Sequence, residues 1–199
     1  MPDPETLKFY ADNAEAYAQH AERPSAQLAG FLAQLPPGGA VLELGTGNGR
    51  DAAAMRTAGF AVTPSDASPE LAAEAEKRLG MPVRIMAFHE LADESAYDGV
   101  WACACLLHAP RHELTDALAR IFAALRPGGR LMASFKAGDA EGRDQFGRYY
   151  NYLSADQLHD HLRASGPWAS LDITAADGSG YDGKPTRWLW AEACKAAAR

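Results

Sequence analysis

Apolar residues along this chain occur in short runs that alternate with amphipathic segments. The apolar runs predict β-strands at residues 41–44, 60–65, 82–87, 97–103 and 130–135. Ala-rich or amphipathic segments between them predict helices over residues 51–58, 68–79 and 112–125. Strand–helix–strand repetition at this spacing is typical of parallel strands with helices on both faces. The pattern therefore predicts an α/β fold with a doubly wound sheet.

The start of the chain follows a different pattern. Residues 4–34 show helical spacing in two pieces, with a break at residues 23–25. The Pro-Pro-Gly-Gly segment at residues 36–39 ends this helical leader. We therefore expect a leader over residues 1–37 that precedes the sheet.

The end of the chain predicts one more helix and a hairpin. Ser154 and Gln157 have the spacing of a capping box, which begins a helix that runs to about residue 164. Two closing strands, 169–174 and 186–192, flank a Gly-rich turn at 177–183. We expect a sheet core over residues 38–199 and, with the leader, a single domain over residues 1–199.

Composition narrows the classes of function. The chain has 199 residues and a formal net charge of −7, which disfavours a nucleic-acid partner because phosphate backbones attract basic faces. Its longest apolar run, residues 100–107, is far shorter than a membrane span, and the N-terminus lacks the features of a signal peptide. The three cysteines cannot form a disulfide framework. We expect a cytoplasmic protein with no membrane partner and an unknown oligomeric state.

The segment after the first predicted strand carries the chemistry. Gly45, Gly47 and Gly49 alternate there, so the backbone can turn tightly and approach a ligand. Asp66 ends the next strand, 19 residues after Gly47, a separation at which a carboxylate can bind ribose hydroxyls. A dinucleotide loop needs its third glycine at position 50, where Arg50 stands, and Glu43 would repel a pyrophosphate. The loop therefore favours a nucleoside ligand that carries an amino group.

At these residues the chain resembles the class I S-adenosylmethionine-dependent methyltransferases. The resemblance covers residues 41–192 and rests on VLELGTGNGR at 41–50, Asp-Ala-Ser at 66–68, Tyr-Asp-Gly-Val-Trp at 97–101 and Leu-Arg-Pro-Gly-Gly at 125–129. It is nearest to small bacterial members of the tellurite-resistance and small-molecule type. The resemblance implies a Rossmann-like, mostly parallel seven-stranded sheet whose last strand is antiparallel, with an N-terminal helical lid.

The resemblance also implies a role for individual residues. S-adenosyl-L-methionine would be the cofactor, with Glu43 facing its amino group, Asp66 accepting both ribose hydroxyls and Ala67 lying against adenine. The remaining cofactor-binding positions are Tyr17 in the lid, Gly45, Thr46, Gly47 and Gly49 in the loop, Phe88 after the third strand, and Cys103 and Ala104 after the fourth. Two plainer interpretations stay open: the leader tyrosines, Tyr10 and Tyr17, could pack against the sheet, and Asp51 could simply complement a helix dipole.

The acceptor is expected to bind beyond the fifth strand. Residues 136–152 are polar and Gly-rich and then aromatic, so Arg143, Tyr149 and Tyr150 are candidates for substrate binding. A second Gly-rich turn, at 177–184, is expected to close the same pocket together with Arg187 and Trp188. The alternative is that this connection is solvated and its tyrosines cover the core.

Catalysis of methyl transfer needs few residues. The donor is already activated, so the protein chiefly aligns the reactants, and a base is needed only where the acceptor loses a proton. His108 is the first candidate base because imidazole titrates near neutral pH, and Tyr149 is the second. No metal is expected, since Pro110 separates His108 from His112 and no HExxH pattern is present.

The sequence favours an enzyme that methylates a small molecule. Little of the chain remains for a separate target-recognition domain outside the predicted cofactor-binding sheet. Two alternatives stay open at this stage: a non-catalytic S-adenosylmethionine-binding module with the same fold, and a nicotinamide-dependent oxidoreductase.

Overall fold

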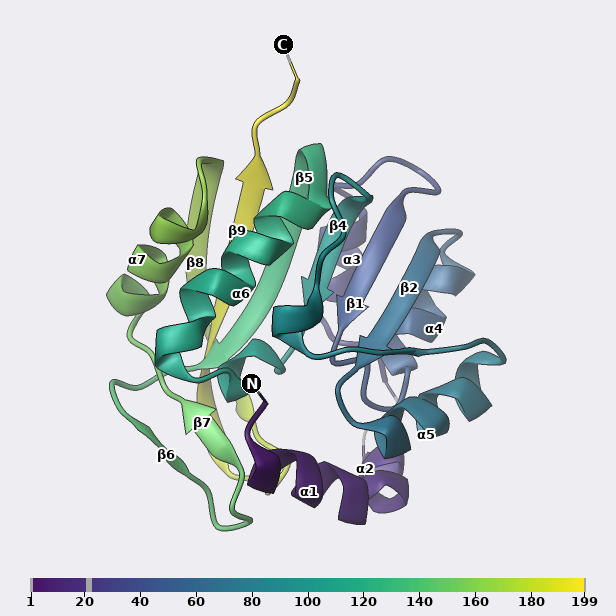
Figure 1. The fold of residues 1–199 in the computed structure, drawn as a ribbon, viewed down its shortest axis with the longest axis vertical. Coiled ribbons are helices and arrows are strands. Elements are labelled where there is room, and N and C mark those ends of the chain that lie inside the picture. Colours follow the sequence, from purple (N-terminus) through teal and green to yellow (C-terminus); the bar gives the residue numbers. More distant parts are fainter. Residues whose placement is uncertain (1, 21–22, 199) are drawn as a thin grey trace.

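The computed structural model describes residues 2–20 and 23–198, and a seven-stranded sheet forms its centre (Figure 1). The strand order is β3-β2-β1-β4-β5-β9-β8. Every neighbouring pair in the first five strands is parallel, and β9 is antiparallel to both β5 and β8. The predicted Rossmann-like, mostly parallel seven-stranded sheet with an antiparallel last strand is thus confirmed.

The elements follow the predicted alternation. The strands are β1 (Ala40–Leu44), β2 (Ala61–Asp66), β3 (Arg84–Ile85), β4 (Tyr97–Ala102), β5 (Leu125–Lys136), β6 (Glu141–Arg143), β7 (Tyr149–Asn151), β8 (Trp168–Ser179) and β9 (Pro185–Lys195). The α-helices are α1 (Pro4–Asp12), α2 (Ala14–His20), α3 (Leu28–Leu32), α4 (Arg50–Thr57), α5 (Pro69–Leu79), α6 (Arg111–Ala124) and α7 (Ala155–Ser165). Two short 3-10 helices are η1 (Phe88–Glu90) and η2 (Leu106–His108).

A separate apolar core lies on each face of the sheet. Successive residues of a strand point to opposite faces, so Val100 joins the core under α6 and α7 while Trp101 joins the core under α3, α4 and α5. Because both faces are buried, the central strands are apolar along their whole length rather than alternating. The carboxyl ends of the parallel strands remain uncovered by these layers.

Helix ends agree with their sequence signals. The Ser68 hydroxyl accepts a hydrogen bond from the Leu71 N–H at 3.3 Å, and α5 ends at Gly80, which has a left-handed φ of +63°. Ser154 and Gln157 form the reciprocal capping box at the start of α7. These local signals need no tertiary contact, which is why the sequence predicts them correctly.

Some predicted boundaries are wrong, and each difference has a cause in the hydrogen bonds of the backbone. The first leader piece is two helices, because Asn13 caps α1 with its side chain and backbone on the Phe9 carbonyl. Strand β5 begins at Leu125 rather than 130, and residues 177–179 belong to β8 rather than to a turn, because both segments pair with β9 or β4. The expected loop at 136–152 contains the β6–β7 hairpin.

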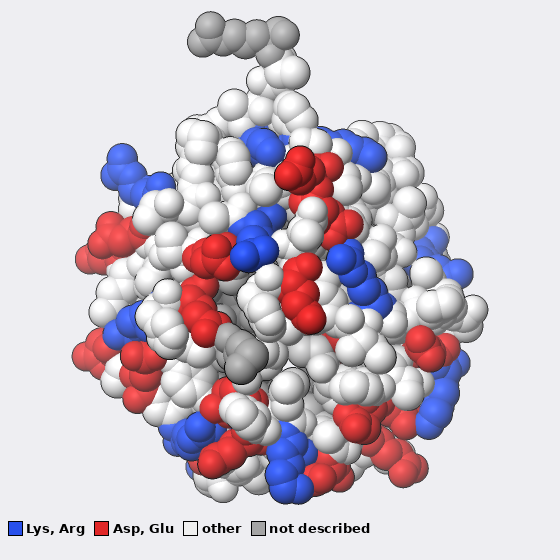
Figure 2. Space-filling model, in the orientation of Figure 1, with Lys and Arg blue, Asp and Glu red and all other residues white. Residues whose placement is uncertain are grey.

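The leader lies across the open end of the sheet. Figure 1 shows α1 and α2 at the carboxyl ends of β1 and β2, with the β6–β7 hairpin beside α1. Among the described residues, no helix has the length and apolarity to cross a membrane. Figure 2 shows basic and acidic side chains intermixed over the face of the molecule that is seen in Figure 1.

Candidate active site

Two cavities lie beneath the leader at the carboxyl edge of the sheet. The larger has a volume of about 360 Å³ and the smaller about 280 Å³. Five residues line both: Tyr17, Gly45, Gly47, Cys103 and Ala104. The cavities therefore adjoin at the glycine loop and the end of β4. In open α/β sheets this edge is where ligands bind.

The loop after β1 requires its glycines. Gly45 has a φ of +64°, and a Cβ there would lie 2.4 Å from the Cβ of Cys105. Gly47 and Gly49 are also left-handed, with φ values of +57° and +74°. The Thr46 N–H donates to the Ser65 carbonyl at 2.8 Å, which fixes the loop against the end of β2. A bare backbone consequently forms the floor of both cavities.

Asp66 lies at the end of β2 and lines the larger cavity together with Ala67 and Phe88. Its carboxylate accepts the N–H groups of Gly47 at 3.0 Å and Ser68 at 2.9 Å. Burial nevertheless raises the pKa of Asp66 to about 6, and these two donors only partly offset it. The Ala67 backbone also lowers the pKa, and because a carboxylate can accept about four hydrogen bonds, Asp66 keeps capacity for a further donor.

Glu43 lines the smaller cavity and is itself buried. The Thr46 hydroxyl donates to its carboxylate, which explains the place of Thr46 in the loop. Burial raises the pKa of Glu43 well above its usual value, and the nearby carboxylates of Asp51 and Asp66 add to the shift. A cationic group in the cavity would stabilise the ionised form of Glu43.

The end of β4 carries backbone strain next to both cavities. Ala104 has a φ of +54°, which is rare for a residue with a Cβ. The Ala104 N–H donates to the Ser134 hydroxyl at 2.8 Å, so β5 holds the strained residue in place. Strain of this kind is concentrated at ligand-binding and active sites.

Comparisons with known proteins agree with this geometry. Residues 41–129 match a methyltransferase domain family. The 27-O-demethylrifamycin SV methyltransferase of Amycolatopsis mediterranei (strain S699) is 29% identical over 190 residues, which cover 83% of this chain and 68% of that protein. A crystal structure of the Burkholderia thailandensis 1,6-didemethyltoxoflavin-N1-methyltransferase, with bound 1,6-didemethyltoxoflavin and S-adenosylhomocysteine, is 28% identical. The likeness covers 96% of this chain and 85% of that one, with a TM-score of 0.76.

The domain match and these two relatives support a class I S-adenosylmethionine-dependent methyltransferase. A phosphoethanolamine N-methyltransferase from Haemonchus contortus, in complex with S-adenosyl-L-methionine, shares the fold at 17% identity and a TM-score of 0.74. That likeness covers 94% of this chain and 57% of the Haemonchus protein. The finer resemblance to the tellurite-resistance type stays a prediction.

Asp51 anchors the leader of this methyltransferase to its sheet. Its buried carboxylate accepts the N–H and the hydroxyl of Ser25, both at 2.8 Å, and the indole N–H of Trp101 at 3.0 Å. These three bonds join the segment after α2 to the start of α4 and to β4. A structural anchor therefore describes Asp51 better than a plain complement to the helix dipole.

Tyr10 and Tyr17 form the roof of the methyltransferase site. Tyr17 lines both cavities, Tyr10 lines the larger one, and their rings meet edge to face at 5.1 Å between centroids. The ring of Tyr17 also stacks on Tyr181, from the turn between β8 and β9, at 5.1 Å. The two leader tyrosines thus face the site rather than the apolar cores.

His108 lines the larger cavity but does not titrate near neutral pH. Burial lowers its pKa to about 4. Its Nδ1 lies 2.6 Å from the Tyr149 carbonyl oxygen, which can only accept, so Nδ1 carries the proton. The Nε2 of the neutral ring then accepts a hydrogen bond from the Tyr10 hydroxyl at 2.9 Å. His108 therefore holds the leader in place through Tyr10, and both side chains line the larger cavity.

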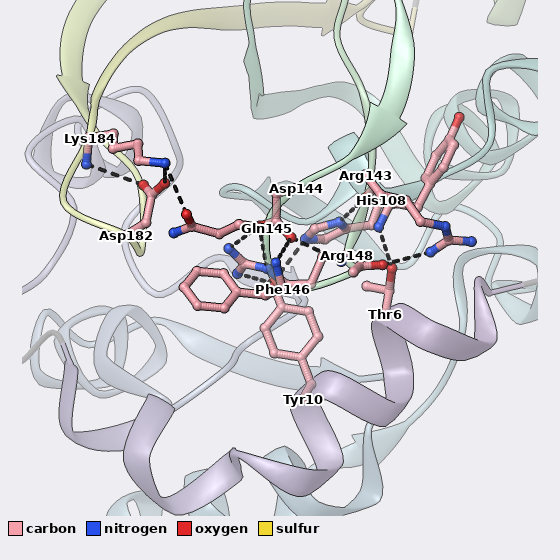
Figure 3. A network of polar contacts seen from close by, with 12 residues as sticks. Thr6, Tyr10, His108, Arg143, Asp144, Gln145, Phe146, Arg148, Asp182 and Lys184 are labelled. Carbon is pink, nitrogen blue, oxygen red and sulfur yellow. Dashed lines mark hydrogen bonds and ion pairs between the residues drawn. The ribbon is translucent and has the colours of Figure 1, made fainter.

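Arg148 links three segments around the lid (Figure 3). Its buried guanidinium forms an ion pair with Asp144 at 2.7 Å and donates to the Tyr10 hydroxyl at 3.3 Å. Five aromatic rings surround it, with centroids 4.7–5.8 Å from Cζ. They belong to Phe9, Tyr10, Phe146, Tyr150 and Tyr181. Arg148 thus fastens α1 to the β6–β7 hairpin and to the turn between β8 and β9.

The three expected acceptor-binding residues lie elsewhere, and neither cavity described above has them in its lining. Arg143 is exposed and pairs with Asp3 at 2.7 Å, so it also fastens the leader. The Tyr149 hydroxyl donates a hydrogen bond to the Glu141 carboxylate. Tyr150 is buried against His108, with 4.6 Å between the two ring centroids. The lining of the smaller cavity includes Ser179, Gly180 and Tyr181 from the turn expected at 177–184, together with Trp188, whereas Arg187 is not part of it.

Proposed function

We propose that this methyltransferase transfers the methyl group of S-adenosyl-L-methionine to a small-molecule acceptor by in-line displacement. One observation carries the proposal: two buried acids flank a shared glycine floor, with Asp66 in one cavity and Glu43 in the other. A ligand that has ribose hydroxyls at one end and an amino group at the other matches this spacing of acids. The two relatives described above, which act on a rifamycin and a toxoflavin precursor, support an acceptor of small size.

The residues present fit the cofactor. Asp66 would accept the ribose hydroxyls with its remaining capacity, and Ala67 and Phe88 would border the adenine. Glu43, held by Thr46, would face the amino group, and Gly45, Gly47 and Gly49 would leave room for the methionine part. Cys103 and Ala104 would then lie under the sulfonium. When bound, the cofactor supplies a methyl group already activated for displacement.

The chain's own residues align the reactants and exclude water. The leader, residues 1–37, acts as a lid on the core of a single methyltransferase domain, and Tyr17 closes the junction of the two cavities. Proton removal is a secondary task. For an acceptor that must lose a proton at the junction of the cavities, Tyr10 and His108 on the larger-cavity side are the candidates, and Nε2 of His108 would accept the proton of the Tyr10 hydroxyl. The Tyr149 hydroxyl, bonded to Glu141, is the weaker candidate.

Calorimetry with S-adenosylhomocysteine tests the proposal. The protein should bind it with a micromolar Kd, and Asp66→Ala should weaken binding at least tenfold, because the ribose hydroxyls lose a charged partner. Absence of binding at millimolar ligand, or selective binding of NAD, would overturn the proposal. Radiolabelled methyl transfer to a panel of small acceptors then separates an enzyme from a non-catalytic binding module.

A further inference from the structure

Three aromatic side chains line the smaller cavity, and each comes from a different segment. Tyr17 belongs to α2, Tyr181 to the turn between β8 and β9, and Trp188 to β9. The aromatic residues in the lining of the larger cavity, Tyr10, Tyr17 and Phe88, already have roles in the proposed function. The function proposed above leaves Tyr181 and Trp188 without a task.

Contacts outside the cavity hold two of these rings in position. Tyr181 stacks on Tyr17 at an interplanar angle of 27°, and its ring centroid lies 5.2 Å from Cζ of Arg148. Phe9 and Phe146 meet the edges of the same ring, each at 5.8 Å between centroids. Ordering Tyr181 on ligand binding would therefore cost little conformational entropy.

The indole of Trp188 is positioned by a glycine on the neighbouring strand. A Cβ at Gly178 would lie 3.0 Å from Cδ1 and 3.2 Å from Nε1 of Trp188. Any larger residue at position 178 would displace the indole. Because Gly178 has no side chain, the ring of Trp188 can lie against β8 at that position.

The aromatic wall lies on the acceptor side of the proposed cofactor. Asp66 borders only the larger cavity and Glu43 only the smaller, so a bound cofactor would pass from one to the other through the residues that line both. The sulfonium would lie at that junction. The smaller cavity, at about 280 Å³, extends from Glu43 to Trp188. The cofactor's amino group would take the Glu43 end, which leaves the end at Ser179, Tyr181 and Trp188 for the acceptor.

The polar groups of this cavity match the edge of a flat ring better than a phosphate. Ser179 and Arg50 provide polar groups in the lining of the smaller cavity. Arg50 lies 3.7 Å from the Asp51 carboxylate and donates to the Ser25 hydroxyl at 3.4 Å. Arg50, the basic residue of this lining, is thus already partnered by Asp51 and Ser25, which disfavours a phosphorylated acceptor.

We propose that the acceptor is a planar aromatic or heteroaromatic molecule that stacks on Trp188 and Tyr181 in the smaller cavity. The inference rests on the proposed methyl transfer, because the acceptor must reach a methyl group at the junction of the cavities. Stacking on rings that are already in position favours flat ligands, and each aromatic pair contributes a few-fold to about tenfold in affinity.

Binding of flat probes to the complex with S-adenosylhomocysteine tests this proposal. Lumazine, quinoline and 1-naphthol serve as planar probes, and phosphoethanolamine is the non-planar, phosphorylated comparison. At least one planar probe should bind and quench tryptophan fluorescence, whereas phosphoethanolamine should not. Trp188→Phe should abolish most of the quenching, and the matched variant Trp168→Phe, altered where β8 packs on Phe122, should retain it.

Affinities of the variants complete the test. Trp188→Ala and Tyr181→Leu should each weaken the planar probe about tenfold, and Trp188→Ala should leave the Kd for S-adenosylhomocysteine within twofold. Gly178→Val should have the same effect by displacing the indole, and it replaces Trp188→Ala if that variant does not fold. Failure of all planar probes at millimolar concentration, or equal probe affinity in all three variants, would overturn the proposal. If the unmodified protein does not bind S-adenosylhomocysteine at all, that result would instead contradict the proposed function.

Discussion

The Tyr10 hydroxyl and Nε2 of His108 lie 2.9 Å apart, and this contact joins the lid to the short helix after β4. It requires a neutral imidazole with its proton on Nδ1, which the Tyr149 carbonyl accepts at 2.6 Å. The same burial that lowers the pKa of His108 to about 4 keeps the ring in this form at neutral pH. Lid position and histidine tautomer are therefore coupled.

Nitrogen NMR of the histidine side chains should show this coupling. We expect His108 to be the Nδ1–H tautomer at pH 6, with a pKa near 4. Since an unfolded histidine has a pKa of about 6.5, the unfolded state takes up the proton first. Stability from this group is complete above pH 6.5 and is lost as pH falls towards 4. Tyr10→Phe removes the donor to Nε2, so the His108 pKa should rise; a titration near 6.5 in the unmodified protein would contradict the assignment.

Cofactor affinity should depend on pH through Asp66. Burial raises its pKa from 3.8 to about 6, so below pH 6 the free protein carries a proton there. Ribose hydroxyls favour the ionised carboxylate, and binding must then release that proton. The Kd for S-adenosylhomocysteine should rise about tenfold per pH unit below pH 6 and level off above it. In calorimetric titrations Asp66→Asn should bind more weakly and with a flatter pH profile, whereas Glu43→Gln should keep the dependence on Asp66.

Gly45→Ala should disable the ligand-binding loop. The new Cβ would lie 2.4 Å from Cys105 and would sit on a left-handed backbone, which alone costs about 1 kcal/mol. We expect loss of S-adenosylhomocysteine binding together with a lower midpoint of thermal unfolding. Gly142→Ala is the matched control, because no atom lies within 4 Å of a Cβ built at that position. Equal behaviour of the two variants would refute the close approach of the loop to the end of β4.

Removing the Asp51 carboxylate should destabilise the fold. Asp51→Ala leaves the buried indole N–H of Trp101 and the Ser25 hydroxyl without their acceptor, at a cost of about 3 kcal/mol in the free energy of unfolding. For a chain of this size the midpoint of thermal unfolding should fall by roughly 6–12 °C. Asp116→Ala, which removes an exposed pair with Arg120, should change the free energy by less than about 0.5 kcal/mol in urea titrations.

Arg148 should determine how firmly the lid is closed. Arg148→Met leaves Asp144 without its buried partner and removes the donor to Tyr10, so we expect a loss of about 3 kcal/mol. Hydrogen exchange in α1 and the dissociation rate of S-adenosylhomocysteine should both increase. Arg143→Met breaks an exposed pair with Asp3 and should change stability much less than Arg148→Met. If α1 exchanges equally slowly in both variants, Arg148 does not hold the lid.

Local signals account for most of what could be predicted. The glycine loop, the Ser68 cap and the Ser154 capping box depend on residues a few positions apart, and all occur where the sequence places them. The parallel order of the sheet follows from the alternation of strands and helices, because right-handed crossovers permit few arrangements. Asp66 could be chosen from its separation of 19 residues from Gly47, because neighbouring parallel strands end at the same edge of the sheet.

The lining of the smaller cavity could be predicted only in part: the turn at 177–184 and Trp188 were expected there, but which residues of 136–152 would be absent was not. Arg143 and Tyr149 are polar residues in the expected segment, but their partners, Asp3 and Glu141, turn them away from the cavities. Tyr181 reaches the site only because β8 and β9 extend past Gly178 to the carboxyl edge of the sheet.

By itself the sequence determined the α/β architecture, the ligand-binding loop and the acid at the end of β2, since these depend on short-range patterns and on the connection rules of parallel sheets. The tertiary structure alone decided which individual aromatic and polar side chains line the two cavities and which fasten the leader. Those roles depend on contacts between the leader, the β6–β7 hairpin and the β8–β9 turn, which are far apart in the chain, and no local pattern encodes which of several polar and aromatic residues will meet there.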